Sequence, residues 1–247
     1  MIILVCIDDT DNLESRGTGK LASLLAADLE RNCWGKSSFI TRHQLFVHPD
    51  VPYTSHNSSM CFSADLDYRN VDRFIAHSSE FLEKESAQGA DPGLCVVVVD
   101  KLVSPEPIID FGLRAKREVL AKRDAYDLAC RHEIYLSEHG GTGDGVIGAL
   151  AGVGLRLSGN DGRLRGKLEI GCENSAVSVR TIRSHPHAPT VRSLCGKTLE
   201  DYELVKLGDK VKAVFLDSKP VLLVSAVAPA VDGARWRTCS KQDLMSY

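Results

Sequence analysis

The 247-residue sequence lacks the marks of several common protein classes. Its eight cysteines are scattered and never form a Cys-x-x-Cys pair, so their spacing predicts neither a zinc knuckle nor a small disulfide framework and suits a reducing cytoplasm. A formal net charge of −3 and the lack of a basic, aromatic-rich segment give no general attraction for nucleic acid or an anionic membrane. The first apolar run is short, follows no basic segment and stops at Asp8, which argues against a signal peptide or a membrane span. We therefore expect a cytoplasmic protein with one large or two small domains.

The first eleven residues carry the strongest chemical signal. Residues 2–7 are apolar and mostly β-branched or leucine, which predicts a buried strand. Asp8, Asp9 and Asp11 follow at once, and clustered like charges at the end of a buried strand repel one another and lose hydration. A divalent cation removes both penalties, and carboxylate oxygens suit Mg²⁺. The local residues leave two interpretations open, a magnesium site held by these aspartates or an acidic, solvated turn.

The stretch that follows favours phosphate binding. Gly17-Thr18-Gly19-Lys20 opens a helical pattern in which leucine recurs at positions 21, 24, 25 and 29. The free N–H groups and positive dipole end of such a helix bind phosphate oxygens, and Lys20 adds a cation. The stretch is not a P-loop, because Glu14 stands where the first glycine belongs and Leu21 where Ser or Thr belongs. A plain flexible helix start explains the glycines equally well.

The middle of the chain alternates predicted strands and helices, which indicates an α/β (α+β) fold. The patterns predict strands over 39–47, 60–66 and 94–99, an irregular loop over 48–57, a helix over 71–85 and a charged helix over 114–131. The run 94–99 is almost continuously apolar, which is typical of a sheet covered on both faces.

A glycine-rich stretch after His139 is the second candidate site. Glycines at 140, 141, 143 and 145 let the backbone approach a ligand closely, and a short helix is predicted to begin at Val146. The N-terminus of such a helix binds anions, whereas Asp144 favours a cation or a hydroxyl group there. The alternative interpretation is that the glycines only permit close packing of the helix. Beyond it we predict a hairpin of residues 155–157 and 163–170, then strands over 177–182, 211–216 and 221–226 in a small β appendage.

Three motifs in the same order resemble the archaeal isoleucine-tRNA agmatinylcytidine synthetase family over residues 1–170. Ile-Asp-Asp-Thr-Asp at 7–11, with Gly17-Thr18 opening a helix, is similar to the start of that family's kinase-like domain. His48-Pro49, Pro52-Tyr53 and Asn57 resemble its Asn-Pro-x-x-Pro-Tyr-x-x-x-x-Asn stretch. Residues 145–151, Gly-Val-Ile-Gly-Ala-Leu-Ala, resemble the Gly-Leu-Ile-Gly-Ala-Leu-Ala element of its ferredoxin-like domain.

The resemblance implies ATP and Mg²⁺ (magnesium) as cofactors, with the metal held by Asp8, Asp9 and Asp11. Thr18 matches a family threonine that can accept a phosphoryl group, and it joins the three aspartates as the predicted catalytic set. The candidate nucleotide- and phosphate-binding residues are Thr10, Gly17, Gly19, Lys20 and Asn57. The candidates for the substrate pocket, where the family binds agmatine, are His139, Gly143, Asp144, Gly145 and Asp161.

The resemblance also divides the chain. Residues 1–100 correspond to an Asp-rich, kinase-like nucleotide domain, 101–175 to a ferredoxin-like domain and 176–247 to a small β-rich segment. Thr18-Gly19-Lys20 replaces the family's Cys-Thr-Thr. Because the sequence has no Cys-x-x-Cys, we expect no counterpart of the family's OB-fold and zinc ribbon.

The interpretation that we favour is therefore a stand-alone relative that acts as an enzyme. It would be an ATP-dependent ligase or phosphotransferase that activates a small molecule by phosphoryl or nucleotidyl transfer, for ligation to a cationic amine such as agmatine. We do not expect it to engage tRNA without a partner protein. The alternative is a non-catalytic sensor that binds a nucleotide or an amine.

Overall fold

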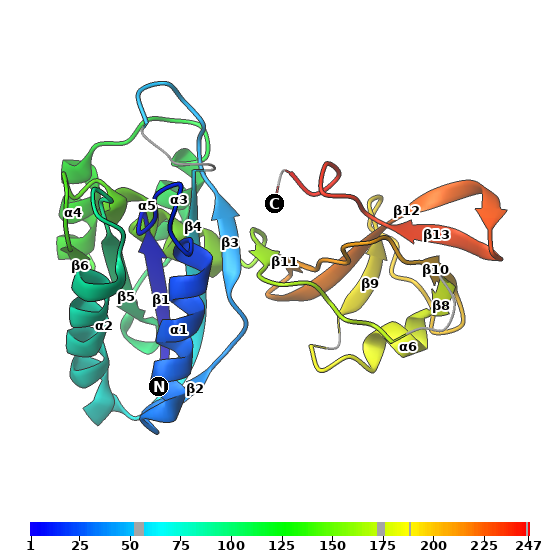
Figure 1. The fold of residues 1–247 in the computed structure, drawn as a ribbon, viewed down its shortest axis with the longest axis horizontal. Helices are drawn as coiled ribbons and strands as arrows, with labels where there is room; N and C mark the ends of the chain where they lie inside the picture. The colour runs from blue at the N-terminus through cyan, green and yellow to red at the C-terminus, as the bar shows by residue number, and fades with distance from the viewer. Residues whose placement is uncertain (52–56, 172–175, 188, 246) are drawn as a thin grey trace. The chain divides into compact units, whose positions relative to one another are not determined.

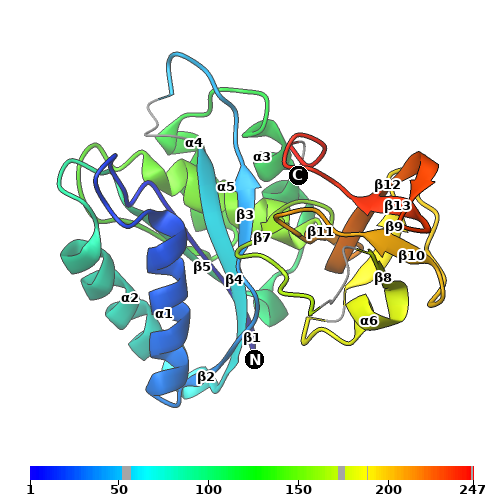
Figure 2. The same cartoon turned by 45° about the vertical axis from the view of Figure 1, so that its right-hand side comes forward.

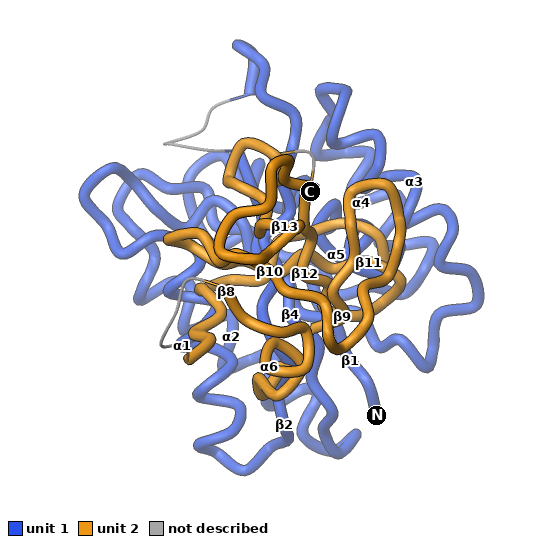
Figure 3. The backbone as a smooth tube through the Cα atoms, turned by 90° about the vertical axis from the view of Figure 1, so that its right-hand side faces the viewer, with its two compact units in different colours: residues 1–158 blue, residues 159–247 orange. Residues whose placement is uncertain are grey.

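The computed structural model describes residues 1–51, 57–171, 176–187, 189–245 and 247, and the fold is mixed α/β, as predicted (Figure 1). By its contacts the chain divides into two compact units, Met1–Ser158 and Gly159–Tyr247, which Figure 3 shows in two colours. The domain boundary predicted at 100/101 lies inside unit 1, and the division into three domains stays a prediction. None of the described helices has the length and apolar character needed to span a bilayer.

An antiparallel sheet forms the centre of unit 1. Its strands run in the order β6-β5-β1-β4-β3, and β2 pairs with the far end of β4. The bounds are β1 Ile2–Asp8, β2 Gly35–Ser37, β3 Thr41–Gln44, β4 Ser58–Leu66, β5 Gly93–Val98 and β6 Tyr135–Glu138. The apolar run at the N-terminus is therefore the middle strand of the sheet, with a neighbour on each side.

Helices cover both faces of this sheet, as the apolar run of β5 predicted (Figure 1 and Figure 2). The bounds are α1 Thr18–Arg31, α2 Val71–Glu85, α3 Glu106–Arg114, α4 Lys122–Arg131 and α5 Gly145–Leu157, with 3₁₀ turns at Tyr68–Asn70 and Val99–Lys101. One core contains Ile3, Val5 and Ile7 of β1 with α1 and α2, and the other contains Leu4 and Cys6 with α3, α4 and α5. Because successive side chains of a strand point to opposite faces, packing on both sides holds β1 in place.

The charged helix predicted over 114–131 is wrong. Helix α3 ends at Arg114, and α4 begins only at Lys122. Ala115 and Leu120, within the break, are buried in the core. The backbone oxygen of Ala115 accepts a hydrogen bond from the N–H of Phe46 at 2.9 Å instead of continuing the helix. A long-range backbone contact thus interrupts a segment whose local composition favours helix.

The hairpin strand predicted at residues 155–157 is also wrong. These residues form the last turn of α5, which runs for 13 residues. Val153 and Leu155 are fully buried and continue the apolar face of the helix against the sheet. The turn signal that follows is real, but it ends a helix.

Unit 2 is mainly β. Its strands run in the order β7-β11-β12-β13-β10-β8, and β9 pairs with β12. The bounds are β7 Arg163–Leu164, β8 Ala176–Ser178, β9 Thr190–Ser193, β10 Leu204–Lys206, β11 Val214–Leu216, β12 Lys219–Val231 and β13 Ala234–Thr238, with helix α6 Val179–Arg183. The long strand β12 therefore pairs with β11, β13 and β9, which come from three separate parts of the chain.

Three strands predicted in unit 2 are shorter than expected, and the one predicted over 211–216 is confined to Val214–Leu216. The strand predicted over 163–170 is confined to Arg163–Leu164. The strand predicted over 177–182 stops at Ser178, whose hydroxyl accepts a hydrogen bond from the N–H of Thr181 at 3.2 Å. Ser178 thereby caps the N-terminus of α6, and the chain turns from strand to helix there.

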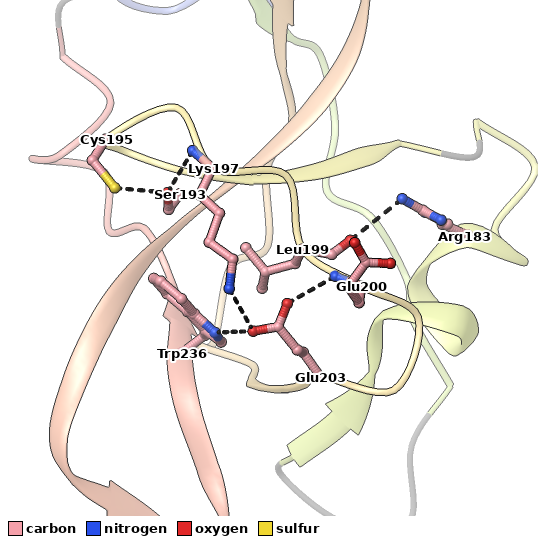
Figure 4. Close-up of polar contacts among 8 residues, drawn as sticks. All are labelled: Arg183, Ser193, Cys195, Lys197, Leu199, Glu200, Glu203 and Trp236. Carbon is pink, nitrogen blue, oxygen red and sulfur yellow. Dashed lines mark hydrogen bonds and ion pairs between the residues drawn. The ribbon is translucent and has the colours of Figure 1, made fainter.

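A polar cluster around Glu203 ties the turn after β9 to β13 (Figure 4). The Oε1 atom of Glu203 accepts from Trp236 Nε1 at 3.0 Å and from Lys197 Nζ at 3.2 Å. Its Oε2 atom accepts from the N–H of Glu200 at 2.8 Å. One half-buried carboxylate thus joins the connection between β9 and β10 to strand β13, which indicates a structural role.

Candidate functional site

The three N-terminal aspartates lie where β1 leaves the sheet. The strand register places Asp8 opposite Gly93 of β5, and only 8% of Asp8 is exposed. Asp9 has a left-handed φ of 50°, which turns the chain sharply out of the strand. Asp11 is half-buried two residues later. A strained backbone beside buried like charges is costly, and such costs concentrate at functional sites.

Hydroxyl groups join the aspartate loop to the start of α1. Thr10 Oγ1 donates to Thr18 Oγ1 at 3.1 Å, and Thr18 Oγ1 donates to Asp11 Oδ1 at 3.0 Å. Gly17 precedes the helix with a φ of 81°, and no side chain caps it. No side-chain oxygen of the described residues therefore caps the first N–H groups of α1, although the N–H of Lys20 donates to the backbone oxygen of Gly17 at 2.9 Å. These N–H groups lie next to the acidic loop.

Helix α5 begins against the same aspartates. Asp91 holds the glycine-rich loop, since it accepts the N–H of Thr142 at 2.6 Å and its hydroxyl at 2.8 Å. A Cβ added to Gly145 would lie 2.1 Å from the backbone oxygen of Asp91. A Cβ added to Gly148 would lie 1.6 Å from Asp8 Oδ2. The bare backbone of α5 therefore touches the acidic residues at both positions.

These elements surround a cavity of about 270 Å³ in unit 1. Its lining includes seven acidic residues, Asp8, Asp9, Asp11, Asp50, Asp91, Glu118 and Asp144. An apolar part includes Leu45, Phe46, Leu120 and Ile147. Lys122 also lines the cavity, but its Nζ atom is engaged by Glu138 Oε2 at 3.0 Å and the backbone oxygen of Thr142 at 2.6 Å. The cavity is thus suited to a ligand with a cationic part and an apolar part.

Burial and charge repulsion raise the pKa values of two of these carboxyl groups. Burial raises the pKa of Asp8 to about 8, and the charges of Asp9 and Asp11 add to the shift. Burial also raises the pKa of Asp9 to about 6, with further contributions from Asp91, Asp11 and Asp144. A cation in the cavity would stabilise the ionised form of both groups.

The lining fits a Mg²⁺ ion that is bound together with a phosphate. Mg²⁺ usually takes one or two carboxylates, and phosphate oxygens and waters complete its octahedron. Among the residues that the structure describes, no three His, Cys, Asp or Glu side chains are arranged to hold a metal by themselves. A site completed by a nucleotide agrees with this arrangement, while the three aspartates as metal ligands stay a prediction.

Comparison with known proteins identifies the fold. No family model and no curated protein matches the chain. A tRNA fluorescent labeling enzyme matches with a TM-score of 0.55 and 28% identity, over 62% of this chain and 36% of that chain. The complex of TiaS with tRNA(Ile2) and ATP matches with the same four values. The complex of TiaS with tRNA(Ile2), AMPCPP and agmatine matches with a TM-score of 0.53 and 27% identity, over 62% of this chain and 36% of that chain.

This chain is TiaS-like. TiaS is a tRNA(Ile2) agmatidine synthetase, so the comparison confirms the family that the three sequence motifs indicated. The chain spans 36% of the length of the TiaS chains in these two complexes. Asp8, Asp9 and Asp11 of the predicted acidic motif all line the cavity.

The cavity brings together some of the other predicted site residues. Asp144 and Gly145 line it, as does Asn57, whose Nδ2 donates to the backbone oxygen of Phe46 at 2.6 Å. Gly19 is half-buried in the first turn of α1. The motif residues Pro52 and Tyr53 lie outside the described residues.

Four predicted residues or groups lie elsewhere. Lys20 is exposed and does not line the cavity. Gly143 packs against Glu138, because a Cβ there would lie 1.5 Å from Glu138 Oε2. His139 Nε2 pairs with Ser137 Oγ at 2.8 Å. Asp161 is buried in unit 2.

Asp91 is the main lining residue that the sequence did not reveal. It lies in a loop that shows no periodic pattern and no motif. The usable signal is the pairing of β1 with β5, because in an antiparallel pair the end of one strand lies beside the start of the other. Nothing in the local sequence says that these two strands are neighbours.

The raised pKa values predict that the nucleotide-free protein loses stability as the pH rises. In the unfolded chain both aspartates ionise near pH 4, whereas in the folded chain they hold their protons up to about pH 6 and 8. Their contribution is complete below pH 4 and disappears as the pH passes these values. At pH 8.5 we expect Asp8→Asn to be more stable than the wild type by on the order of a few kcal/mol, with a smaller difference at pH 5. Urea unfolding in EDTA measures this, and a difference that is independent of pH would contradict it.

Proposed function

We propose that the acidic cavity binds Mg²⁺·ATP and that the chain carries out an ATP-dependent modification related to that of TiaS. The observation that carries the proposal is the buried carboxyl group of Asp8, with the half-buried one of Asp9 beside it, next to a start of α1 that no side chain of the described residues caps. The match to TiaS complexes that contain ATP or AMPCPP supports it. Activation would proceed by phosphoryl or nucleotidyl transfer.

The residues of the site have distinct roles in this proposal. Asp8, Asp9 and Asp11 hold the metal, and the N–H groups at the start of α1 hold phosphate oxygens. When bound, Mg²⁺ neutralises charge on the phosphates. Thr18 Oγ1 donates to Asp11 Oδ1, so Asp11 is placed to hold the proton of this hydroxyl group.

The second substrate that we propose is a cationic amine such as agmatine. Asp91 and Asp144 add negative charge beyond what one metal ion neutralises, and they are on the cavity lining. Leu120 and Ile147 on the same lining suit a methylene chain. The TiaS complex that contains both AMPCPP and agmatine supports a pocket of this kind.

The acceptor that we propose is an RNA. The expectation that tRNA is not engaged finds no support, because the matched TiaS complexes contain tRNA(Ile2). The overall charge of −3 also conceals a division: residues 1–158 contain 16 Lys and Arg against 23 Asp and Glu, whereas residues 159–247 contain 14 against 10. Unit 2 is therefore the positively charged part, and we propose that it attracts the phosphate backbone.

A non-catalytic sensor of nucleotide or amine is the second candidate. The observation that favours it is the position of Lys20, which is exposed and does not line the cavity. A phosphate group bound at the start of α1 would be held by the helix N–H groups and a metal ion, and not by Lys20.

We expect ATP together with Mg²⁺ to raise the Tm of the purified full chain, and neither alone to do so. At about 100 times the Kd the expected shift is about 5 °C or more. Consumption of ATP is then followed by chromatography of the nucleotides with agmatine, other polyamines and tRNA transcripts. The absence of a shift with any nucleotide would contradict the proposal. A shift without consumption across the whole panel would favour the sensor.

A further inference from the structure

Two buried hydroxyl groups have no hydrogen-bond partner among the residues that the structure describes, Ser59 Oγ and Ser86 Oγ. Both flank the aspartate loop. Ser59 lies on β4 beside the end of β1, and Ser86 precedes Ala87, whose N–H donates to the backbone oxygen of Thr10 at 3.0 Å. An unpaired buried hydroxyl costs free energy, so each one calls for a reason.

Ser59 lies next to Asp8 on the same face of the sheet. The register pairs Cys6 with Cys61 and Ile7 with Met60, and the next step along both strands places Asp8 opposite Ser59. Both side chains point at α5, one helical turn apart: a Cβ at Gly148 would meet Asp8 Oδ2 at 1.6 Å, and a Cβ at Gly152 would meet Ser59 Oγ at 2.4 Å.

Strand pairing brings the two side chains close together. Directly opposite residues of an antiparallel pair have Cβ atoms roughly 4.5–5.5 Å apart, and each of these side chains carries its oxygen one or two bonds further. Ser59 is fully buried, and the two positions of α5 that face it and Asp8 are glycines, which carry no side chain. The hydroxyl is a donor, and an ionised carboxylate is an acceptor only.

We propose that Ser59 is a positioning residue for Asp8, whose carboxylate it holds by a hydrogen bond when Asp8 binds Mg²⁺·ATP. The inference rests on the proposed function. Groups that hold a metal ligand in place typically change metal affinity 10- to 100-fold when they are removed. In the free protein the hydroxyl is an unpaired, buried group, and in the complex it gains a charged partner.

The proposal predicts opposite effects of Ser59→Ala on stability and on binding. Removal of an unpaired buried hydroxyl raises the Tm of the nucleotide-free protein by about 2 °C or more. The same substitution weakens binding of Mg²⁺·ATP by about 10-fold, as measured by isothermal titration calorimetry. A purely structural serine would not move the two quantities in opposite directions.

Ser78→Ala is the matched control. Ser78 is also fully buried, but its Oγ donates to the backbone oxygen of Phe74 at 2.6 Å on the other side of the sheet. We expect its Tm to be unchanged or lower and its affinity for Mg²⁺·ATP to equal that of the wild type.

Three outcomes would overturn the inference. Unchanged affinity in Ser59→Ala shows that the hydroxyl does not hold Asp8. A fall in both Tm and affinity shows a general loss of packing. If the wild type itself binds no Mg²⁺·ATP, the proposed function fails, and the inference about Ser59 fails with it.

Discussion

Asp8→Asn is expected to weaken the binding of Mg²⁺·ATP by about 100-fold or more and to abolish ATP consumption. Asp8 is the most buried of the three aspartates and touches the backbone of α5 at Gly148. An amide keeps the shape of the side chain but removes the charge that attracts the cation, and water cannot replace it at a site with 8% exposure. Calorimetry with Mg²⁺·ATP and an assay of nucleotide products measure the two effects.

Glu14→Gln is the control for this variant. Glu14 follows the aspartates in the same loop, but it is exposed and does not line the cavity. At a pH above about 8, where Asp8 is ionised, Glu14→Gln removes the same unit of charge as Asp8→Asn, so a long-range electrostatic effect would appear in both variants. Equal loss of affinity in Glu14→Gln, or near-normal binding in Asp8→Asn, would contradict a direct role of Asp8.

Gly93→Ala is expected to destabilise the protein by on the order of 3 kcal/mol or more. A Cβ at this position would lie 2.2 Å from the backbone carbon of Gly145 and 2.4 Å from the nitrogen of Val146. These are backbone atoms at the start of α5, so no side-chain rotation relieves the overlap. The helix would have to move away from β5, and the cavity beside Asp8 would change shape. Urea unfolding measures the free energy, and Mg²⁺·ATP binding reports on the cavity.

Gly171→Ala separates this effect from the general cost of replacing glycine. A Cβ at Gly171 meets no atom of the described residues within 4 Å, and the backbone there does not have a left-handed φ. We expect its stability to lie within about 0.5 kcal/mol of the wild type. Gly93→Ala with stability close to that of Gly171→Ala would show that α5 does not need the close approach.

Local sequence patterns predicted the elements whose apolar periodicity is complete. The strand at residues 2–7, the helix that starts after Gly17 and the helix over 71–85 are all present. In each of them the packing agrees with the local propensity, so a prediction from neighbouring residues succeeds. The ordered motifs also indicated the TiaS-like family, which the comparison with solved structures confirms.

Patterns failed where distant segments decide the conformation. The break between α3 and α4 depends on the backbone bond from Phe46 to Ala115, which joins residues far apart in the sequence. The last turn of α5 depends on burial of Leu155 against the sheet. Neither contact leaves a mark in the residues around the predicted boundary.

The candidate site shows the same division. The sequence by itself determined that three carboxylates follow a buried strand and precede a glycine-led helix, because that order is local. Only the tertiary structure decided that Asp91 and the start of α5 meet them, and that Ser59 lies opposite Asp8. Strand pairing and close helix approach set these contacts, and both depend on residues that are far apart in the chain.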